Sequence, residues 1–198
     1  MILQIIKNKV LKQSKQKKLL VGLGNITTKY QNTRHNVGFM LINYLKEQLN
    51  FPDFEEKPNL FCFLTKKTDP NQLTILAKPT TYMNDSGKAI KKIMKYFKIQ
   101  ISDIIIVHDD LDIEFGHYKI QKQKGPRVHN GITSVENQLG TNDFVRIRIG
   151  IETRNNQERI KFQGKDFVLS DFKNQEKEQL NKQIFPKIYS DLENSSTI

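Results

Sequence analysis

Residues 19–45, LLVGLGNITTKYQNTRHNVGFMLINYL, decide the fold of this chain. The first three are apolar and predict a short buried strand. Gly22 and Gly24 then predict a turn with unusual backbone angles, and a polar loop with His35 follows. Residues 38–49 have helical apolar periodicity. Because a strand, a turn and a helix can hold a reactive side chain at a sheet edge, we take this stretch as the candidate active site.

The segments that follow predict more strands and helices. Residues 51–59 predict a loop, and residues 60–66 and 73–77 predict a hairpin. Ser86 can cap a helix that runs to about Lys98. Residues 103–108 are β-branched and predict a central strand, buried on both faces, that stops at the carboxylates of residues 109–112. The later predictions are a strand at 117–121, a basic loop at 122–128, a helix at 130–139 ended by Gly140, a strand at 144–151, a mobile polar segment at 155–164, and a helix at 171–192 that kinks or restarts at Pro186.

Composition narrows the class of protein. The chain has 198 residues, enough for one domain with a core. Its 32 basic and 21 acidic residues give a net charge of +11, which suits nucleic acid or an anionic membrane surface, although solubility alone also explains it. One cysteine, Cys62, excludes a disulfide framework and a cysteine-rich zinc site. No apolar run reaches the roughly 18 residues of a transmembrane helix.

The N-terminal segment differs from the rest of the chain. Residues 1–18 contain six lysines and no acidic residue, and their isoleucines can gather on one helical face. This pattern predicts either a mitochondrial targeting segment or a basic arm for RNA. We therefore expect a basic extension at 1–18 and a folded domain at 19–198, in the mitochondrion or, alternatively, in the cytoplasm.

The candidate chemistry is metal-free and rests on histidine. The dinucleotide fingerprint, the phosphate-binding loop, HExxH and GxSxG are all absent from the sequence. His35, partly exposed in its loop, has the side chain that best suits a general base near neutral pH, and Asp109 can fix its tautomer. Asn25, Asn84 and Asn130 can bind a carbonyl and a water, although turn asparagines and loop histidines are more often structural.

Four blocks of sequence together resemble the bacterial-type peptidyl-tRNA hydrolase family. They are VGLGN to RHNVGF (residues 21–39), KPTTYMNDSGKA (78–89), VHDDLDIEFG (107–116) and HNGI to FVRIRIGI (129–151). The resemblance implies a single α/β domain with a twisted mixed β-sheet flanked by helices. It also implies cleavage of the ester between a peptide and the 3′ ribose of tRNA, without a metal or a cofactor.

The resemblance assigns roles to nine residues. His35 is the catalytic base, and Asp109 orients it. The implied substrate-binding residues are Asn25, Tyr30 near the tRNA terminus, Met83 at the peptide, Asn84, His129, Asn130, and Arg148 at a terminal phosphate. The implied substrate is peptidyl-tRNA, and we expect a monomer that also meets the ribosome but no membrane.

The sequence departs from the family pattern in one loop. Residues 125–128, GPRV, stand where the family has a glycine-rich run, and Gln121 stands where it has a lysine. Asp110 replaces the usual glutamate. Because proline and valine restrict the approach of backbone to a ligand, the contacts with tRNA are expected to be rearranged. The alternative function is therefore a catalytically weak RNA-binding or ribosome-associated protein that retains the fold.

Overall fold

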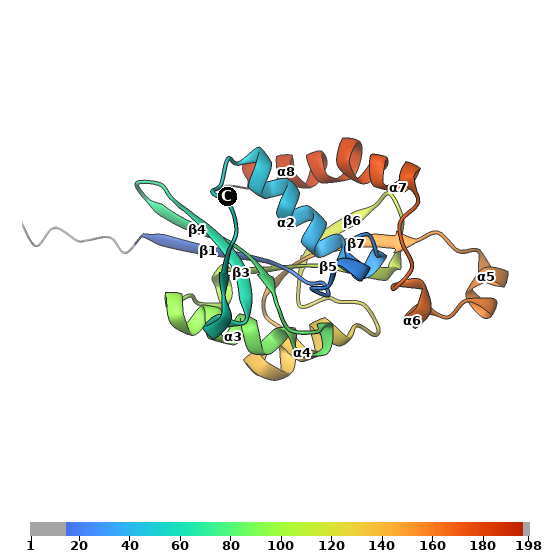
Figure 1. Cartoon of the computed structure of the whole chain (residues 1–198), viewed down its shortest axis with the longest axis horizontal. Helices are drawn as coiled ribbons and strands as arrows, with labels where there is room; N and C mark the ends of the chain where they lie inside the picture. Colours follow the sequence, from blue (N-terminus) through green and yellow to red (C-terminus); the bar gives the residue numbers. More distant parts are fainter. Residues whose placement is uncertain (1–14, 196–198) are drawn as a thin grey trace, which may run out of the picture.

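A computed structural model describes residues 15–195. A seven-stranded sheet with the order β2-β3-β4-β1-β5-β7-β6 lies at its centre (Figure 1). The strands are β1 (Gln16–Gly22), β2 (Glu55–Lys57), β3 (Cys62–Thr68), β4 (Gln72–Pro79), β5 (Ile104–Glu114), β6 (Tyr118–Lys122) and β7 (Val145–Glu152). The helices are α2 (Val37–Gln48), α3 (Ser86–Phe97), α4 (Asn130–Leu139), α5 (Asn156–Lys161), α6 (Gly164–Phe167), α7 (Asn174–Gln179) and α8 (Phe185–Asn194). The short turns are η1 (Thr28–Tyr30), η2 (Arg34–Asn36), η3 (Pro58–Leu60), η4 (Met83–Asp85), η5 (Ile101–Asp103) and the π-helical η6 (Leu180–Ile184).

The sheet is mixed, which confirms the predicted α/β fold class. Strands β4, β1, β5 and β7 run parallel, whereas β2, β3 and β6 join antiparallel at the two sides. The β3–β4 pairing confirms the predicted hairpin. Because the central strands are parallel, their carboxyl ends meet at one edge, where open α/β sheets bind ligands.

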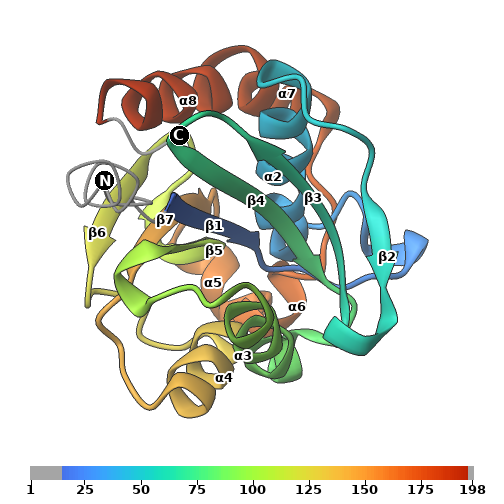
Figure 2. The same cartoon turned by 90° about the vertical axis from the view of Figure 1, so that its left-hand side faces the viewer.

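Helices cover both faces of the sheet. Helices α2, α7 and α8 lie on one face, and α3 and α4 lie on the other (Figure 2). Alternate residues of β1 enter different cores: Leu20 packs with Leu41 and Ile188, and Leu19 packs with Ile90. Strand β5 divides its side chains in the same way, with Ile105 and Val107 in one core and Ile104 and Ile106 in the other, so the prediction that residues 103–108 form a central strand buried on both faces is confirmed. Within residues 15–195, no helix has the length and hydropathy that a membrane span requires.

The glycines of the opening stretch act through close packing, not through unusual backbone angles. Among the described residues, the glycines with positive φ are Gly116 and Gly140. A Cβ at Gly22 would lie 2.4 Å from the carbonyl oxygen of Gly38, and a Cβ at Gly38 would lie 2.5 Å from that of Leu23. The start of α2 can therefore pack directly on the end of β1, which sets the position of the loop before α2.

Strand β5 continues through the carboxylates instead of stopping at them. Asp109 and Asp110 pair with Ile149 and Gly150 of β7, and the strand ends at Glu114. The expected stop was wrong because other side chains, rather than water, compensate these charges. Asp109 contacts two histidines, and Asp110 binds Arg148.

Several smaller predictions need correction. Ser86 is the first residue of α3 and not its cap, since its hydroxyl donates to the carbonyl oxygen of Met83. The expected loop at 51–59 contains the edge strand β2, which pairs with β3. The polar segment at 155–164 contains α5, begun by a capping box between Asn155 and Glu158.

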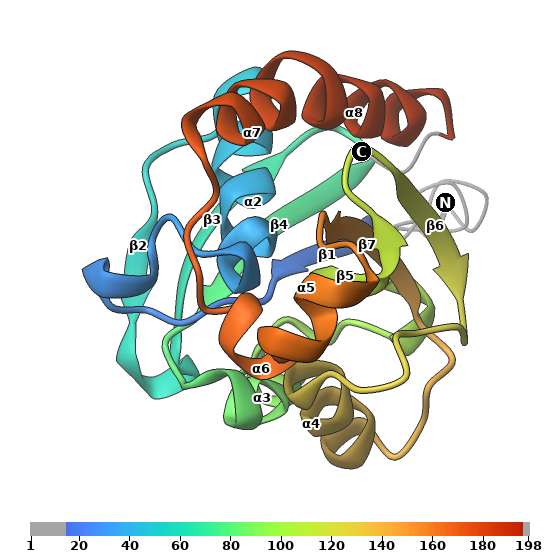
Figure 3. The same cartoon turned by 90° about the vertical axis from the view of Figure 1, so that its right-hand side faces the viewer.

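The two ends of the chain also refine the predictions. Strand β1 begins at Gln16, so residues 16–18 of the predicted extension pair with β4, and residues 1–14 lie outside the described part. The C-terminal helix restarts near Pro186 as predicted, after the π turn η6. Helices α5 and α6 lie together at the sheet edge where β5 and β7 end (Figure 3).

Candidate active site

Residues near the C-terminus hold His35 in place. The backbone N–H of His35 donates to the carbonyl oxygen of Val168 at 2.8 Å. The guanidinium of the preceding Arg34 donates to both carboxylate oxygens of Glu176 at 2.9 Å and stacks on Phe167 and Phe172. His35 is only 8% exposed, so the expectation that it is partly exposed was wrong. The loop is covered by residues more than a hundred positions later in the chain.

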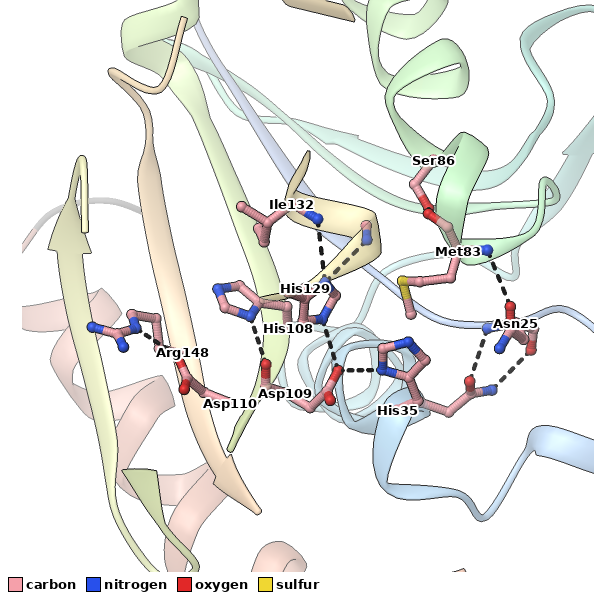
Figure 4. Close-up of polar contacts among 12 residues, drawn as sticks. Asn25, His35, Met83, Ser86, His108, Asp109, Asp110, His129, Ile132 and Arg148 are labelled. Atoms are coloured by element: carbon pink, nitrogen blue, oxygen red, sulfur yellow. Dashed lines mark hydrogen bonds and ion pairs between the residues drawn. The ribbon is translucent and has the colours of Figure 1, made fainter. Parts of the chain in front are cut away.

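One oxygen of Asp109 binds two histidines (Figure 4). Its Oδ1 lies 2.8 Å from Nδ1 of His35 and 2.9 Å from Nε2 of His129. The backbone N–H groups of Gly131 and Ile132 donate to Nδ1 of His129 at the start of α4. Nδ1 of His129 is thus an acceptor, and we assign its proton to Nε2, which donates to Asp109.

The same logic assigns the tautomer of His35. Asp109 is a carboxylate: burial acts to raise its pKa, but the electrostatic attraction and hydrogen bonds of the His35 and His129 N–H groups outweigh burial and hold the pKa well below the usual range. Nδ1–H of His35 therefore donates to Asp109, and Nε2, which has no hydrogen-bond partner among residues 15–195, can accept a proton. Burial acts to lower the pKa of His35, but the charge and hydrogen bond of Asp109 outweigh it and raise the pKa above 6.5. The arrangement is a base held by a fixed carboxylate.

A third histidine supports this cluster from the core. His108 is fully buried, and its Nδ1–H donates to the backbone carbonyl oxygen of Asp109 at 2.7 Å. Burial, assisted by the neighbouring His129, holds the pKa of His108 well below its ordinary value. His108 is therefore neutral near pH 7 and positions the strand at Asp109.

Two asparagines form a reciprocal pair beside His35. The backbone N–H of Asn25 donates to Oδ1 of Asn36 at 2.8 Å, and Nδ2 of Asn36 donates to the carbonyl oxygen of Asn25 at 2.9 Å. Oδ1 of Asn25 accepts from the backbone N–H of Met83 at 3.1 Å. Asn25 thus links β1 to η4, and its own NH₂ group stays available. Asn36 was not among the predicted site residues, although an amide side chain directly after the histidine could have indicated it.

A cavity of about 290 Å³ opens at His35 and Asp109. Its other lining residues are Leu111, Pro126, Val128, His129, Asn130, Gly164, Lys165 and Val168. Val128 is 81% exposed at its rim, so the departure from the family's glycine-rich run places apolar side chains at the site. A cavity of about 480 Å³ between β2, β3 and the end of α3 is larger but contains none of the predicted site residues.

The structure brings most of the predicted residues together. His35, Asp109 and His129 are in direct contact, Asn25 binds Met83, and Asn130 lines the cavity. Asn84 is exposed on η4, next to Met83.

Tyr30 and Arg148, which the resemblance assigned to the substrate, do not contact the His35–Asp109–His129 cluster and do not line its cavity. Tyr30 lies in η1, where the ammonium of Lys29 is 5.5 Å from the centre of its ring. Arg148 is 7% exposed and donates to Asp110 at 2.7 Å and to Gln121 at 3.0 Å. In Figure 4 it lies beyond Asp110 from His35. The suggested phosphate contact of Arg148 thus competes with an ion pair already present.

The ligating atoms of His35, Asp109 and His129 lie within 4.8 Å of one another, which is close enough for a cation. The hydrogen bonds argue against this use. A metal ligand needs a nitrogen lone pair, whereas the N–H groups of Gly131 and Ile132 place the proton of His129 on the nitrogen that faces Asp109. The cluster is therefore built to position a proton.

Comparisons with known proteins agree with this geometry. Residues 19–196 match the family described as peptidyl-tRNA hydrolase. The peptidyl-tRNA hydrolase of Mycoplasma mycoides is 37% identical over 91% of this chain and 95% of its own length. That of Aliarcobacter butzleri is 43% identical over 83% of this chain and 82% of its own. The crystal structure of the Acinetobacter baumannii peptidyl-tRNA hydrolase superposes with a TM-score of 0.74 at 27% identity, covering 87% of this chain and 86% of that one. The chain therefore belongs to the peptidyl-tRNA hydrolase family.

Proposed function

We propose that this protein hydrolyses the ester between the peptide and the 3′ ribose of peptidyl-tRNA and thereby recycles tRNA for translation. The observation that carries the proposal is His35 beside a cavity, with Nδ1 bound to a buried carboxylate and Nε2 free. A free imidazole nitrogen of this kind is a general base. Family membership supplies the substrate class.

The reaction needs no covalent intermediate. Nε2 of His35 takes a proton from a water, and the resulting hydroxide attacks the ester carbonyl carbon. Asn25, Asn84 and Asn130 offer amide groups that can bind the oxyanion or orient the water. When the tetrahedral intermediate collapses, the 3′ oxygen of the ribose leaves, and the imidazolium of His35 returns the proton to it. Asp109 stabilises that imidazolium.

The basic charge of the chain supports RNA as the partner. A net charge of +11 favours binding to a polyanion, and such binding weakens as salt rises. The alternative, a catalytically weak RNA-binding or ribosome-associated protein, is less favoured because the base, its carboxylate and the amides are all retained.

The decisive experiment compares two histidine variants on a labelled peptidyl-tRNA. His35→Ala should lose at least about 100-fold in kcat/KM, the scale of a positioned base, and should still bind tRNA. His117→Ala is the matched control, because this imidazole is exposed and lies outside the cavity lining. Its rate should equal that of the wild type. The esterase proposal fails if the wild type releases no peptide or if His35→Ala is as fast.

Three finer statements are proposals of the same kind. We expect a monomer, which sedimentation at micromolar concentration tests, and contact with the ribosome, which co-sedimentation tests.

Residues 1–18 suggest a mitochondrial destination, with the cytoplasm as the alternative. A reporter fused to residues 1–18 decides this, since a diffuse signal contradicts targeting.

A further inference from the structure

One wall of the His35 cavity carries an uncompensated positive charge. Leu111, Pro126, Val128 and Val168 are apolar, and Asp109 is compensated by its two histidines. Lys165, on α6, also lines the cavity. It is exposed, and its ammonium has no hydrogen bond or ion pair with any residue in the range 15–195. An ammonium beside an apolar surface suits a ligand that carries both an anionic group and a flat apolar one.

The backbone that carries Lys165 is fixed relative to the base. Phe167 of the same helix lies against two guanidinium groups, that of Arg34 at 4.4 Å and that of Arg154 at 4.1 Å from its ring centre. The next residue, Val168, accepts the backbone N–H of His35. The backbone of Lys165 therefore keeps a set position beside His35, while its four-carbon stem lets the ammonium adjust to the ligand.

Arg148, the cation that the family resemblance assigns to a terminal phosphate, already has two partners in this protein. Arg148 binds Asp110 and Gln121 on the far side of Asp110 from His35, and it does not line the cavity. Lysine at residue 121 would have offered a second cation there, but this chain has glutamine. An anionic group close to the reacting ester thus meets Lys165 rather than Arg148.

We propose that Lys165 is a specificity-determining residue that binds a phosphate of the substrate's 3′-terminal nucleotide. The inference rests on the proposed function. With the ester carbonyl at Nε2 of His35, the RNA arm and the peptide arm leave the reacting carbon in different directions. The RNA arm carries the phosphates and the flat base, which match Lys165 and the apolar wall. The peptide arm then lies toward Asn25, Met83 and Asn84.

The test uses two minimal substrates, the N-acetyl-phenylalanyl 3′ ester of adenosine and the same ester of adenosine 5′-monophosphate. The wild type should favour the phosphorylated ester about tenfold in kcat/KM, the scale of one charge-assisted contact. Lys165→Ala should abolish this preference, and Lys165→Arg should restore most of it. Lys161→Ala is the matched control, because Lys161 is an exposed lysine on neighbouring α5 that does not line the cavity. It should retain the preference.

If the two esters turn over too slowly, the phosphate preference is measured by inhibition instead. Adenosine and adenosine 5′-monophosphate are used as competitive inhibitors of peptidyl-tRNA hydrolysis, and the ratio of their inhibition constants gives the preference. The proposal is overturned if the wild type shows no phosphate preference by either route, or if Lys165→Ala keeps it. It is also overturned if Lys165→Ala instead changes the preference between acidic and neutral peptides. A wild type that cleaves no peptidyl-tRNA at all contradicts the proposed function instead, so the two failures are distinct.

Discussion

The polar groups around the cavity fall into two sets that are used in opposite ways. The first, the proton-handling set, is His35, Asp109 and His129, all buried, in which Asp109 accepts a hydrogen bond from each histidine. The second, the open set, is Asn130 and Lys165 of the cavity lining and Asn84 on η4, which packs against α4; all three are exposed. Within residues 15–195, no side chain of the open set has a hydrogen bond or an ion pair.

This difference separates chemistry from recognition. The proton-handling set is complete before substrate arrives, so its tautomers and charges need no rearrangement during the reaction. The open set has donors and acceptors that no protein group within residues 15–195 uses, so they are available to a ligand. Substitutions in the first set should therefore change pH dependence and stability as well as rate, whereas substitutions in the second should change substrate binding or rate without changing pH dependence or stability.

After the loss of His35 itself, the largest expected effect is that of Asp109→Asn. The amide cannot stabilise the imidazolium, so kcat/KM should fall roughly 100- to 10,000-fold. The pH profile gives the sharper result. His35 acts as its neutral form, and its pKa is raised in the wild type, so activity falls as pH drops through a value above 6.5. Without the carboxylate, burial is the effect that remains on the pKa of His35, and burial lowers it. The acid limb of the pH profile, which is the pH range where activity falls as His35 is protonated, should therefore move below 6.5.

The control for this prediction is Asp112→Asn, which changes an exposed carboxylate on the same strand. Asn can still accept the backbone N–H of Arg127 that Asp112 accepts, so the acid limb should stay in place. An unmoved limb in Asp109→Asn would show that Asp109 does not set the protonation of His35.

An intermediate loss of activity is expected for Asn130→Ala and Asn25→Ala, since both amides are suggested to bind the oxyanion or the water. The two variants should differ in stability. Asn130→Ala should lower kcat/KM about 10- to 100-fold, the scale of one hydrogen bond to a charged group, and leave the free energy of unfolding within about 0.5 kcal/mol. Asn25→Ala should lower the rate similarly but also cost about 1–2 kcal/mol, because the backbone N–H of Met83 loses its acceptor. Urea unfolding and initial rates measure both. Equal loss of stability in the two variants would contradict the idea that Asn25 stabilises the fold through Met83 while Asn130, in the open set, does not.

Local sequence patterns correctly predicted strands, because strand formation depends mainly on the apolar and β-branched residues within the segment itself. The β-branched run before Asp109 and the apolar alternation around Arg148 placed β5 and β7 correctly. The pairing of His35 with Asp109 follows once β1 and β5 are neighbours, since both side chains then lie at the same sheet edge.

The features that the sequence did not predict depend on contacts between segments that are distant in the chain. The burial of Arg34 needs Glu176 and Phe172, which belong to a region predicted only as an amphipathic helix. The ion pair of Arg148 needs the carboxylate of Asp110, and the sequence alone did not indicate that β5 continues past it. Lys165 was missed because the segment directly before it, residues 155–164, was expected to be mobile, whereas α6 begins at Gly164 and forms part of the cavity wall.

The smallest expected effect tests whether His129 belongs to the proton-handling set or only begins a helix. His129→Ala removes both the acceptor at the start of α4 and the donor to Asp109, so it should cost about 1 kcal/mol of stability and about tenfold in rate. His129→Asn separates the two roles, because asparagine is a good helix cap but lacks the reach and the N–H position of the imidazole. It should recover the stability, measured by urea unfolding, and not the rate. If it recovers both, His129 acts on catalysis only by holding α4, and the proton-handling set reduces to His35 and Asp109.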